Sequence, residues 1–352
     1  MLYEQIKSWL EKMHALRGSD LHLCAGSLPM IRVMGELCPC SETPVADDAL
    51  REAFREIIPE AKIQIFRENH ECDFRWELPG LGYYRVNFFE TINGVAAAFR
   101  EISCRIPSFG ELGLEEQLKR LAFLPKGLVL ITGPTGTGKS TTLAAIVNHA
   151  NQQRRTHIIT IEDPIEYVYG NVKSMVSQRE VGTNTNTFAS ALRAALREDP
   201  DIIVVGEMRD LETTELCIQA AETGHLVFAT LHTESAAQTI DRIINVFPGE
   251  RQALIRMTLA QTISSILSVT LLNRADGSGR IQAMEIMHAT PAVRNLIRDA
   301  RVYQMQSILQ TGHSIGMRTL DMHLAQLCRQ GIITREAALL ASANPQELAE
   351  QI

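Results

Sequence analysis

The chain has 352 residues, which at roughly 150 residues per domain corresponds to two domains or to one large domain with additions. Its 34 Lys and Arg against 41 Asp and Glu give a formal net charge of −7. This balance disfavours a protein that binds nucleic acid through a basic surface, and the 45% hydrophobic fraction argues against a disordered chain.

The most apolar stretch, residues 263–272, is shorter than the roughly 20 residues that a membrane span needs and contains three Ser or Thr. The charged N-terminus lacks an apolar signal core, so we expect a cytoplasmic protein. The seven cysteines include no CxxC pair, which favours reduced structural thiols over a zinc site.

Residues 1–105 are predicted to form a small α+β domain. Apolar residues at helical spacing predict helices, and alternating runs between Gly- and Asn-containing turns predict an antiparallel sheet. The expected helices are 3–16 and 47–66, and the expected strands are 21–24, 29–33, 73–78, 83–89 and 95–102.

Residues 106–118 contain the Pro-Ser-Phe-Gly run of a linker, after which the pattern changes. Short apolar runs alternate with long helical stretches, which is typical of a parallel sheet covered by helices. The expected strands are 127–132, 157–161, 202–205 and 226–230. We therefore predict an α/β core over 119–284 and a mostly helical C-terminal region over 285–352.

The motif GxxxxGK[ST] lies between an expected strand and an expected helix. Its glycines allow backbone N–H groups to face an anion, and the helix N-terminus adds partial positive charge. Lysine can reach the β- and γ-phosphates, and the following serine can ligate Mg²⁺. No guanine-reading motif is present, so ATP is favoured. The predicted ATP-binding residues are Gly133, Pro134, Thr135, Gly136, Thr137, Gly138, Lys139, Ser140 and Thr141.

Acids and histidines follow the other expected strands. Glu207 comes after four apolar residues, which would deliver it to the carboxyl edge of the sheet, where it could orient water or hold Mg²⁺. Glu162 and Asp163 end another strand and are candidate metal ligands with Ser140. His225 and His232 flank the run expected to form the strand 226–230 and could sense the γ-phosphate. Glu207 is favoured as the catalytic acid, with Glu162 left open as an alternative.

Taken together, these motifs resemble the secretion-ATPase superfamily, and most closely its branch that retracts type IV pili. The resemblance rests on GPTGTGKST, IEDPIE, LRAALREDPDIIVVGEMRD and TGHLVFATLHT in this order, and it covers nearly the whole chain. SDLHL near the N-terminus and AVRNLIR at 292–298 add to it. Residues 182–187 depart from the charged segment of many relatives, and we have no functional interpretation of the difference.

This resemblance implies a PAS-like N-terminal domain, a RecA-like P-loop ATPase core and a homohexameric ring that hydrolyses ATP with Mg²⁺. Arg85 and Arg100 would point at the phosphates from the N-terminal domain. The ring would dock at the inner membrane on a platform protein of the pilus machinery, and a second retraction ATPase could act beside it. The segment implied to contact this machinery comprises Ala292, Val293, Arg294, Asn295, Leu296, Ile297 and Arg298.

Three alternatives stay open on the sequence. The first is a pilus-assembly or type II secretion ATPase of the same superfamily, which usually carries a longer N-terminal region and a four-cysteine zinc insertion. The second is a RecA-like motor that moves nucleic acid, although the charge disfavours a nucleic-acid partner. The third is a nucleotide switch or scaffold without turnover, against which the set of acids and arginines argues.

Overall fold

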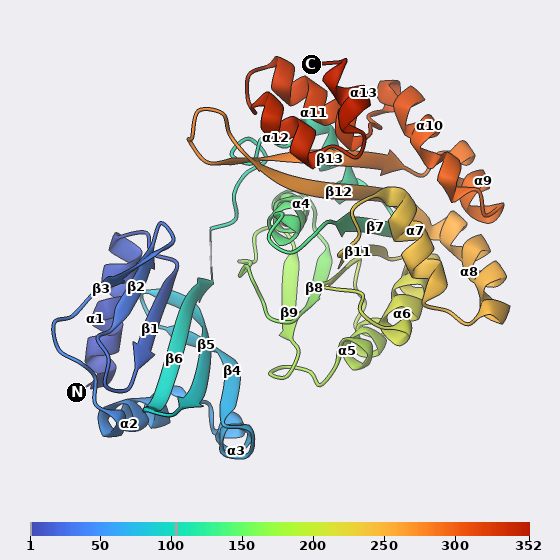
Figure 1. The fold of residues 1–352 in the computed structure, drawn as a ribbon. Coiled ribbons are helices and arrows are strands. Elements are labelled where there is room, and N and C mark those ends of the chain that lie inside the picture. The colour runs from blue at the N-terminus through green and yellow to red at the C-terminus, as the bar shows by residue number, and fades with distance from the viewer. Residues whose placement is uncertain (1, 103–104) are drawn as a thin grey trace. The chain divides into compact units, whose positions relative to one another are not determined.

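The computed structural model describes residues 2–102 and 105–352, apart from the side chain of residue 61. The chain divides into two compact units, one of residues 1–105 with 164–168 and one of residues 106–163 with 169–352. Figure 1 shows both units, each built around its own sheet. Within the described ranges, none of the helices has the length and apolar character needed to cross a lipid bilayer.

The first unit is a six-stranded antiparallel sheet in the order β3-β2-β1-β6-β5-β4, with helices packed on one face. Its side chains alternate, so that Tyr84, Val86 and Phe88 are buried beneath the helices while Arg85 is exposed. The elements are α1 (Leu2–Ala15), β1 (Asp20–Cys24), β2 (Met30–Val33), β3 (Glu36–Pro39), α2 (Asp47–Ile57), α3 (Glu60–Asn69), β4 (Glu71–Leu78), β5 (Gly82–Thr91) and β6 (Gly94–Ile102).

The structure changes two details of this unit. The single helix expected over 47–66 is two helices, because Pro59 lacks the N–H that would continue the first helix and instead stands as the N-cap of α3. Strand β3 was not expected, and its four residues are all exposed, so it lacks the alternation that reveals a strand.

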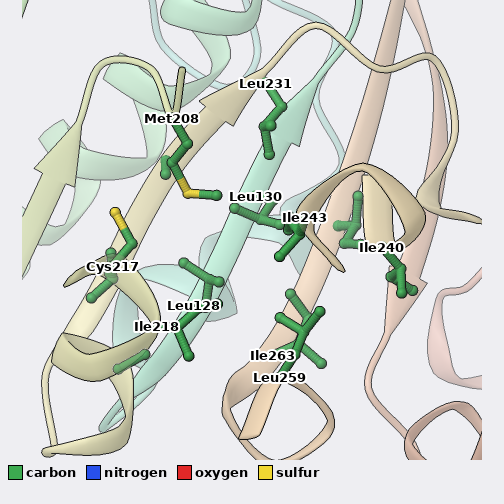
Figure 2. Packing of buried hydrophobic residues seen from close by; sticks show 14 of the residues in the cluster. Leu128, Leu130, Met208, Cys217, Ile218, Leu231, Ile240, Ile243, Leu259 and Ile263 are labelled. Carbon is green, nitrogen blue, oxygen red and sulfur yellow. The ribbon is translucent and has the colours of Figure 1, made fainter. Parts of the chain in front are cut away.

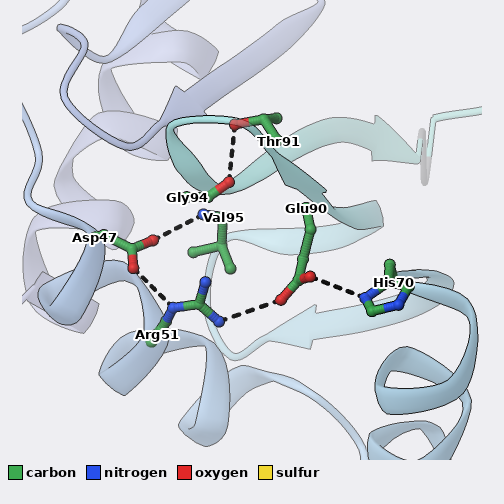
Figure 3. Close-up of polar contacts among 7 residues, drawn as sticks. All are labelled: Asp47, Arg51, His70, Glu90, Thr91, Gly94 and Val95. Atoms are coloured by element: carbon green, nitrogen blue, oxygen red, sulfur yellow. Dashed lines mark hydrogen bonds and ion pairs between the residues drawn. The ribbon is translucent and has the colours of Figure 1, made fainter.

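A polar network ties α2 and the end of α3 to the turn between β5 and β6 (Figure 3). Asp47 accepts the backbone N–H of Val95 at 2.7 Å and a hydrogen bond from Arg51 Nε at 2.8 Å. Arg51 also reaches Glu90, which contacts His70 Nδ1 at 2.9 Å. The network therefore connects α2 and the end of α3 to the two strands β5 and β6.

The second unit is a seven-stranded sheet in the order β13-β12-β7-β11-β10-β8-β9. All neighbours are parallel except β12 and β13, which form an antiparallel pair. The strands are β7 (Gly127–Thr132), β8 (His157–Glu162), β9 (Met175–Glu180), β10 (Ile202–Val205), β11 (Leu226–Leu231), β12 (Ile263–Asn273) and β13 (Arg280–His288). The apolar stretch considered as a membrane span is thus the buried strand β12.

Helices cover both faces of this sheet, so its central strands are apolar on both sides. Leu128 and Leu130 of β7 join one core cluster, shown in Figure 2 with Ile240 and Ile263, while Val129 and Ile131 join the other. The helices and short 3₁₀ turns are η1 (Glu116–Phe123), α4 (Lys139–Gln153), α5 (Phe188–Ala195), α6 (Leu211–Glu222), α7 (Ala236–Asn245), α8 (Gly249–Thr262), α9 (Pro291–Arg298), η2 (Val302–Gln304), α10 (Met305–Thr311), η3 (His313–Ile315), α11 (Leu320–Arg329), α12 (Arg335–Ala341) and α13 (Pro345–Ala349).

The C-terminal residues are mostly helical, as the sequence predicts, but β13 extends to His288 and crosses the expected boundary at 284. Strand β13 also joins these helices to the sheet, because Ile281 and Ala283 share a core cluster with Leu324 of α11. The β12–β13 pair therefore belongs both to the sheet of the second unit and to the core beneath the C-terminal helices.

Candidate functional site

The glycine-rich loop lies between β7 and α4, as the motif predicts. Gly133 and Gly138 have φ angles of 140° and 91°, which side chains rarely tolerate. A Cβ at Gly133 would also overlap the Val269 carbonyl oxygen of β12. These positions therefore need glycine both for backbone conformation and for the close approach of the loop to the β12–β13 pair.

Lys139 is the first residue of α4 and is only 8% exposed. Its Nζ donates to the carbonyl oxygens of Gly133 at 2.7 Å and Pro134 at 2.8 Å, so the ammonium lies over the loop that it follows. Because the N-terminal turn of a helix presents unsatisfied N–H groups, the ammonium and the start of α4 together place positive charge and N–H donors beside the loop.

Parallel strands bring the other predicted residues to the same edge of the sheet. Glu162 ends β8, Glu207 follows β10 by two residues, and His232 follows β11 directly. The registers of β8, β10, β11 and β7 are continuous, so their carboxyl ends align. The structure thus places Glu162, Glu207 and His232 along the edge from which the glycine-rich loop emerges.

Glu207 is the centre of a charged cluster at this edge. One carboxylate oxygen lies 3.0 Å from His232 Nε2, and the other accepts a hydrogen bond from Arg209 Nε at 2.8 Å. Arg209 also lies 3.8 Å from Asp163, and its hydrogen bond to Glu207 raises the pKa of the guanidinium. Glu207 is 20% exposed, so the cluster fixes an acid that solvent can still reach.

Glu162 has different surroundings. It accepts hydrogen bonds from Thr160 Oγ1 at 2.6 Å and from Gln178 Nε2 at 3.2 Å. Strand β8 is three strands from β7, whereas β10 is two strands away with β11 between them. At about 4.8 Å per strand, Glu207 starts from a strand roughly 10 Å from β7, and Glu162 from one roughly 14 Å away.

His225 does not lie at this edge, and its role as a γ-phosphate sensor stays a prediction. It precedes β11, and its carbonyl accepts the N–H of Gly127, the first residue of β7. Its ring Nδ1 contacts the carbonyl oxygen of Ala220 at 3.0 Å. The six residues of β11 separate the two histidines by roughly 20 Å of strand, so only His232 stands beside Glu207.

Arg85 and Arg100 belong to the first unit, where they are directly opposite each other on β5 and β6. Arg100 Nε donates to the buried Asp20 at 2.8 Å, and Arg85 Nε lies 3.5 Å from Asp73. The side chain of Arg100 remains 66% exposed and that of Arg85 43% exposed, so both guanidinium groups stay accessible on the face opposite the helices.

The AVRNLIR segment lies entirely within α9, which packs against α8. Val293 and Ile297 are fully buried and Leu296 is half-buried, whereas Ala292, Asn295 and Arg298 are exposed. Arg294 donates from Nε to the Ala289 carbonyl at 3.1 Å and from Nη1 to the carbonyls of Gln261, at 2.7 Å, and Ala260. Burial lowers the pKa of this guanidinium. Arg294 thus binds the end of α8, and only part of the segment is a free surface.

Two residues of this region were not expected from the sequence. Arg209 lies two residues from Glu207, and the motif GEMRD could have indicated it. Gln282 contacts Gly138 from β13, 144 residues further along the chain, and no spacing rule in the sequence links the two. The contact arises only from the sheet order.

The chain is similar over most of its length to proteins of known function. Residues 84–295 match the model of the type II/IV secretion system protein family. The chain is 51% identical over 320 residues to the type IV pilus retraction ATPase PilT of Pseudomonas aeruginosa, covering 91% of this chain and 93% of that protein. It is 46% identical to a twitching motility protein of Neisseria gonorrhoeae, covering 91% and 86%.

Among solved structures, the pilus retraction motor PilT with bound ADP superposes with a TM-score of 0.92 at 44% identity, covering 99% of both chains. This similarity confirms the resemblance to the retraction branch and the α/β fold. Because the family model spans more than half of the chain and full-length relatives exceed 30% identity, the chain belongs to the type II/IV secretion system protein family.

Proposed function

We propose that this chain is an ATP-hydrolysing motor that drives retraction of type IV pili. The observation that carries the proposal is the Glu207–His232 pair at the sheet edge from which the Lys139 loop emerges. The similarity over nearly the full length to PilT and to a twitching motility protein supports the same activity. An acid and a lysine loop on one edge are the parts that hydrolysis of a nucleoside triphosphate needs.

The loop residues would bind the phosphates of ATP. Backbone N–H groups of Gly136, Gly138 and Lys139 would face the phosphate oxygens, and the Lys139 ammonium would exchange the Gly133 and Pro134 carbonyls for them. Glu207 would orient the attacking water, while His232 and Arg209 hold its carboxylate in place. Glu162 is the alternative water-orienting acid.

Magnesium fits this donor set. Among the described residues, no cluster of three or more His, Cys, Asp or Glu is arranged to hold a metal by itself. Mg²⁺ in such sites is bound by one or two protein oxygens together with phosphate oxygens, which the Ser140 hydroxyl and the carboxylates of Glu162 or Asp163 would complement. The bound ion would neutralise charge that develops on the phosphates.

The proposed motor has two domains joined by a linker and assembles from six copies of the chain. The first unit would be the PAS-like domain and the sheet of the second unit the RecA-like core, with residues 106–118 as their linker. Six copies would form a ring in which Arg85 and Arg100, whose guanidinium groups are exposed, complete the nucleotide site on closure. Movement of the arginines would then couple hydrolysis to motion.

The ring would act in the cytoplasm, docked at the inner membrane on the platform protein of the pilus machine. The exposed side chains of α9, Asn295 and Arg298, would face this partner together with Ala292. A second retraction ATPase would be a further partner.

Twitching and pilus number in a deletion strain would test this function. Loss of twitching with abundant surface pili is the expected result, because unretracted pili accumulate. Complementation with the wild-type gene should restore movement, and a Glu207→Gln gene should not. Loss of surface pili would instead identify an assembly ATPase and overturn the proposal.

A further inference from the structure

Gln282 of β13 lies directly behind the phosphate-binding loop. Its side chain is only 7% exposed. Nε2 donates to the carbonyl oxygen of Gly138 at 3.2 Å, and Oε1 accepts from the hydroxyl of Thr142, on the first turn of α4, at 3.0 Å. One amide thus connects the last glycine of the loop to the helix that follows it.

These contacts form a closed set of hydrogen bonds. The Gly138 carbonyl also accepts the helical N–H of Thr142 at 2.9 Å, and the Thr142 hydroxyl lies 2.9 Å from the same oxygen. A hydroxyl has one proton, so when Thr142 donates it to Gln282, the amide of Gln282 supplies the second donor to Gly138. The carbonyl is then held by two N–H donors.

The orientation of this carbonyl fixes a phosphate-binding group. In a trans peptide the N–H points opposite to the C=O, so a Gly138 carbonyl held toward α4 turns the N–H of Lys139 toward the loop. We propose that Gln282 is a positioning residue for nucleotide binding, which holds the peptide between Gly138 and Lys139 in the orientation that receives phosphate. The inference rests on the proposed ATPase function.

The shape of the loop supports this assignment. Gly138 adopts a φ of 91°, and a Cβ at this position would overlap Nε2 of Gln282. The space that a side chain at 138 would fill is therefore taken by the amide. Because β13 also packs against the C-terminal helices through Ile281 and Ala283, Gln282 joins the loop to that region.

Nucleotide affinity of purified full-length variants tests the proposal. Gln282→Leu removes both hydrogen bonds, and Gln282→Glu keeps the size but replaces the donor with an acceptor that faces the Gly138 carbonyl. We expect the dissociation constants for ADP and for a non-hydrolysable ATP analogue to rise about two- to tenfold, the loss expected for a neutral hydrogen bond. KM should rise while kcat changes less than about twofold, because the contact serves the ground and transition states alike.

Two further variants sharpen the test. Thr142→Val should weaken binding less than Gln282→Leu, and the double variant should match Gln282→Leu alone, since both changes break one network. The control is Gln152→Leu, at an exposed glutamine of the same helix, which should bind nucleotide like the wild type.

The inference is overturned if Gln282→Leu or Gln282→Glu folds and binds ADP with wild-type affinity, or if it lowers only the Tm of the nucleotide-free protein. Failure of the proposed function is distinguishable, since the wild-type protein itself would then neither bind nor hydrolyse ATP. If Gln282→Leu does not fold, the Gln282→Glu result decides.

Discussion

Glu207 has both carboxylate oxygens occupied, by Arg209 on one side and His232 on the other. Such a carboxylate cannot rotate freely, so one orientation is available to a water molecule at the sheet edge. Positioning of this kind accounts for most of the catalysis in phosphoryl transfer, where the protein supplies little covalent chemistry. The same contacts make Glu207 a better candidate than Glu162 for orienting the water.

Substitution of the two central residues separates binding from turnover. We expect Lys139→Ala to abolish measurable ATP binding, and Glu207→Gln to bind ATP but lower kcat by about 10²- to 10⁴-fold, the range for loss of a general base. ATP hydrolysis and equilibrium binding of purified protein measure both. Glu222→Gln, at an exposed glutamate on α6, should behave as the wild type. Normal turnover by Glu207→Gln would transfer the catalytic role to Glu162.

The cysteines differ in burial, which predicts that they differ in reactivity. Cys217 is fully buried on α6, and burial raises the pKa of its thiol, whereas Cys38 is exposed. Since the thiolate is the reactive form, we expect an alkylating reagent at pH 7.5 to label Cys38 in native protein and Cys217 only after denaturation. Peptide mass spectrometry would measure both sites. Labelling of Cys217 at the rate of Cys38 would show that the core opens readily.

At the scale of elements, the surface network of Figure 3 predicts a dependence on pH. Hydrogen bonds from Arg51 and Val95 lower the pKa of Asp47, and those from His70 and Arg51 lower the pKa of Glu90. A carboxyl whose folded pKa is lowered stabilises the fold above its unfolded pKa and loses this contribution as pH falls through the folded pKa. The stabilisation is therefore present at pH 7 and lost below about pH 4.

Hydrogen exchange at the Val95 amide would show this loss. Between pH 5 and pH 3 we expect its protection, corrected for intrinsic rates, to decrease by a few fold in the wild type. Asp47→Asn should reduce protection at pH 7, because a neutral amide oxygen accepts a weaker hydrogen bond than a carboxylate. It should also flatten the pH dependence, because the amide does not titrate. The exposed Asp48→Asn is the matched control. An unchanged profile in Asp47→Asn would contradict the role of this carboxylate.

The helix pair α8 and α9 gives a prediction that separates structure from partner binding. Arg294 donates to carbonyls at the end of α8, where a cation also complements the helix dipole. We expect Arg294→Ala to lower the free energy of unfolding by about 1–2 kcal/mol, measured by urea titration, because charged hydrogen bonds are lost. Arg298 is exposed, and among the described residues its hydrogen bond goes to Asn295 of the same helix, so Arg298→Ala should leave stability unchanged.

These two variants also test the partner surface. If α9 contacts the pilus machine, Arg298→Ala should impair twitching with normal ATPase activity and stability. Loss of twitching in Arg294→Ala would be accompanied by lower stability. Normal twitching in Arg298→Ala together with Asn295→Ala would contradict the proposed surface.

At the scale of the whole molecule, the proposed ring depends on residues from the first unit. Arg85 and Arg100 keep exposed guanidinium groups on the face of their sheet opposite the helices. If they complete the site on closure, Arg85→Ala and Arg100→Ala should each lower kcat by about 10³-fold or more, as loss of a catalytic arginine does. Assembly into a particle of six 39.2 kDa chains, measured by light scattering, should persist.

The exposed Arg67 on α3 provides the control for these variants. Arg67→Ala should leave both kcat and mass unchanged. Wild-type turnover in Arg85→Ala and Arg100→Ala would remove these residues from the site, and a monomeric wild-type protein with full activity would contradict the ring.

The sequence by itself determined the phosphate-binding loop, because its glycines, lysine and serine are contiguous and act through local backbone geometry. It also located the central parallel strands, whose apolar runs are bounded by glycines and acids. Both features depend on neighbours in the chain. A contiguous motif of this kind needs no knowledge of the fold to be recognised.

Only the tertiary structure decided which side chains meet. His225 and His232 lie at opposite ends of the same apolar run. The direction of β11 puts only His232 beside Glu207. The sheet order β13-β12-β7 brings Gln282 of β13 within reach of Gly138, in the loop that follows β7. Arg294 contacts the end of α8 because α9 packs against that helix. Contacts between distant segments follow from strand order and helix packing, which a local pattern of residues does not contain.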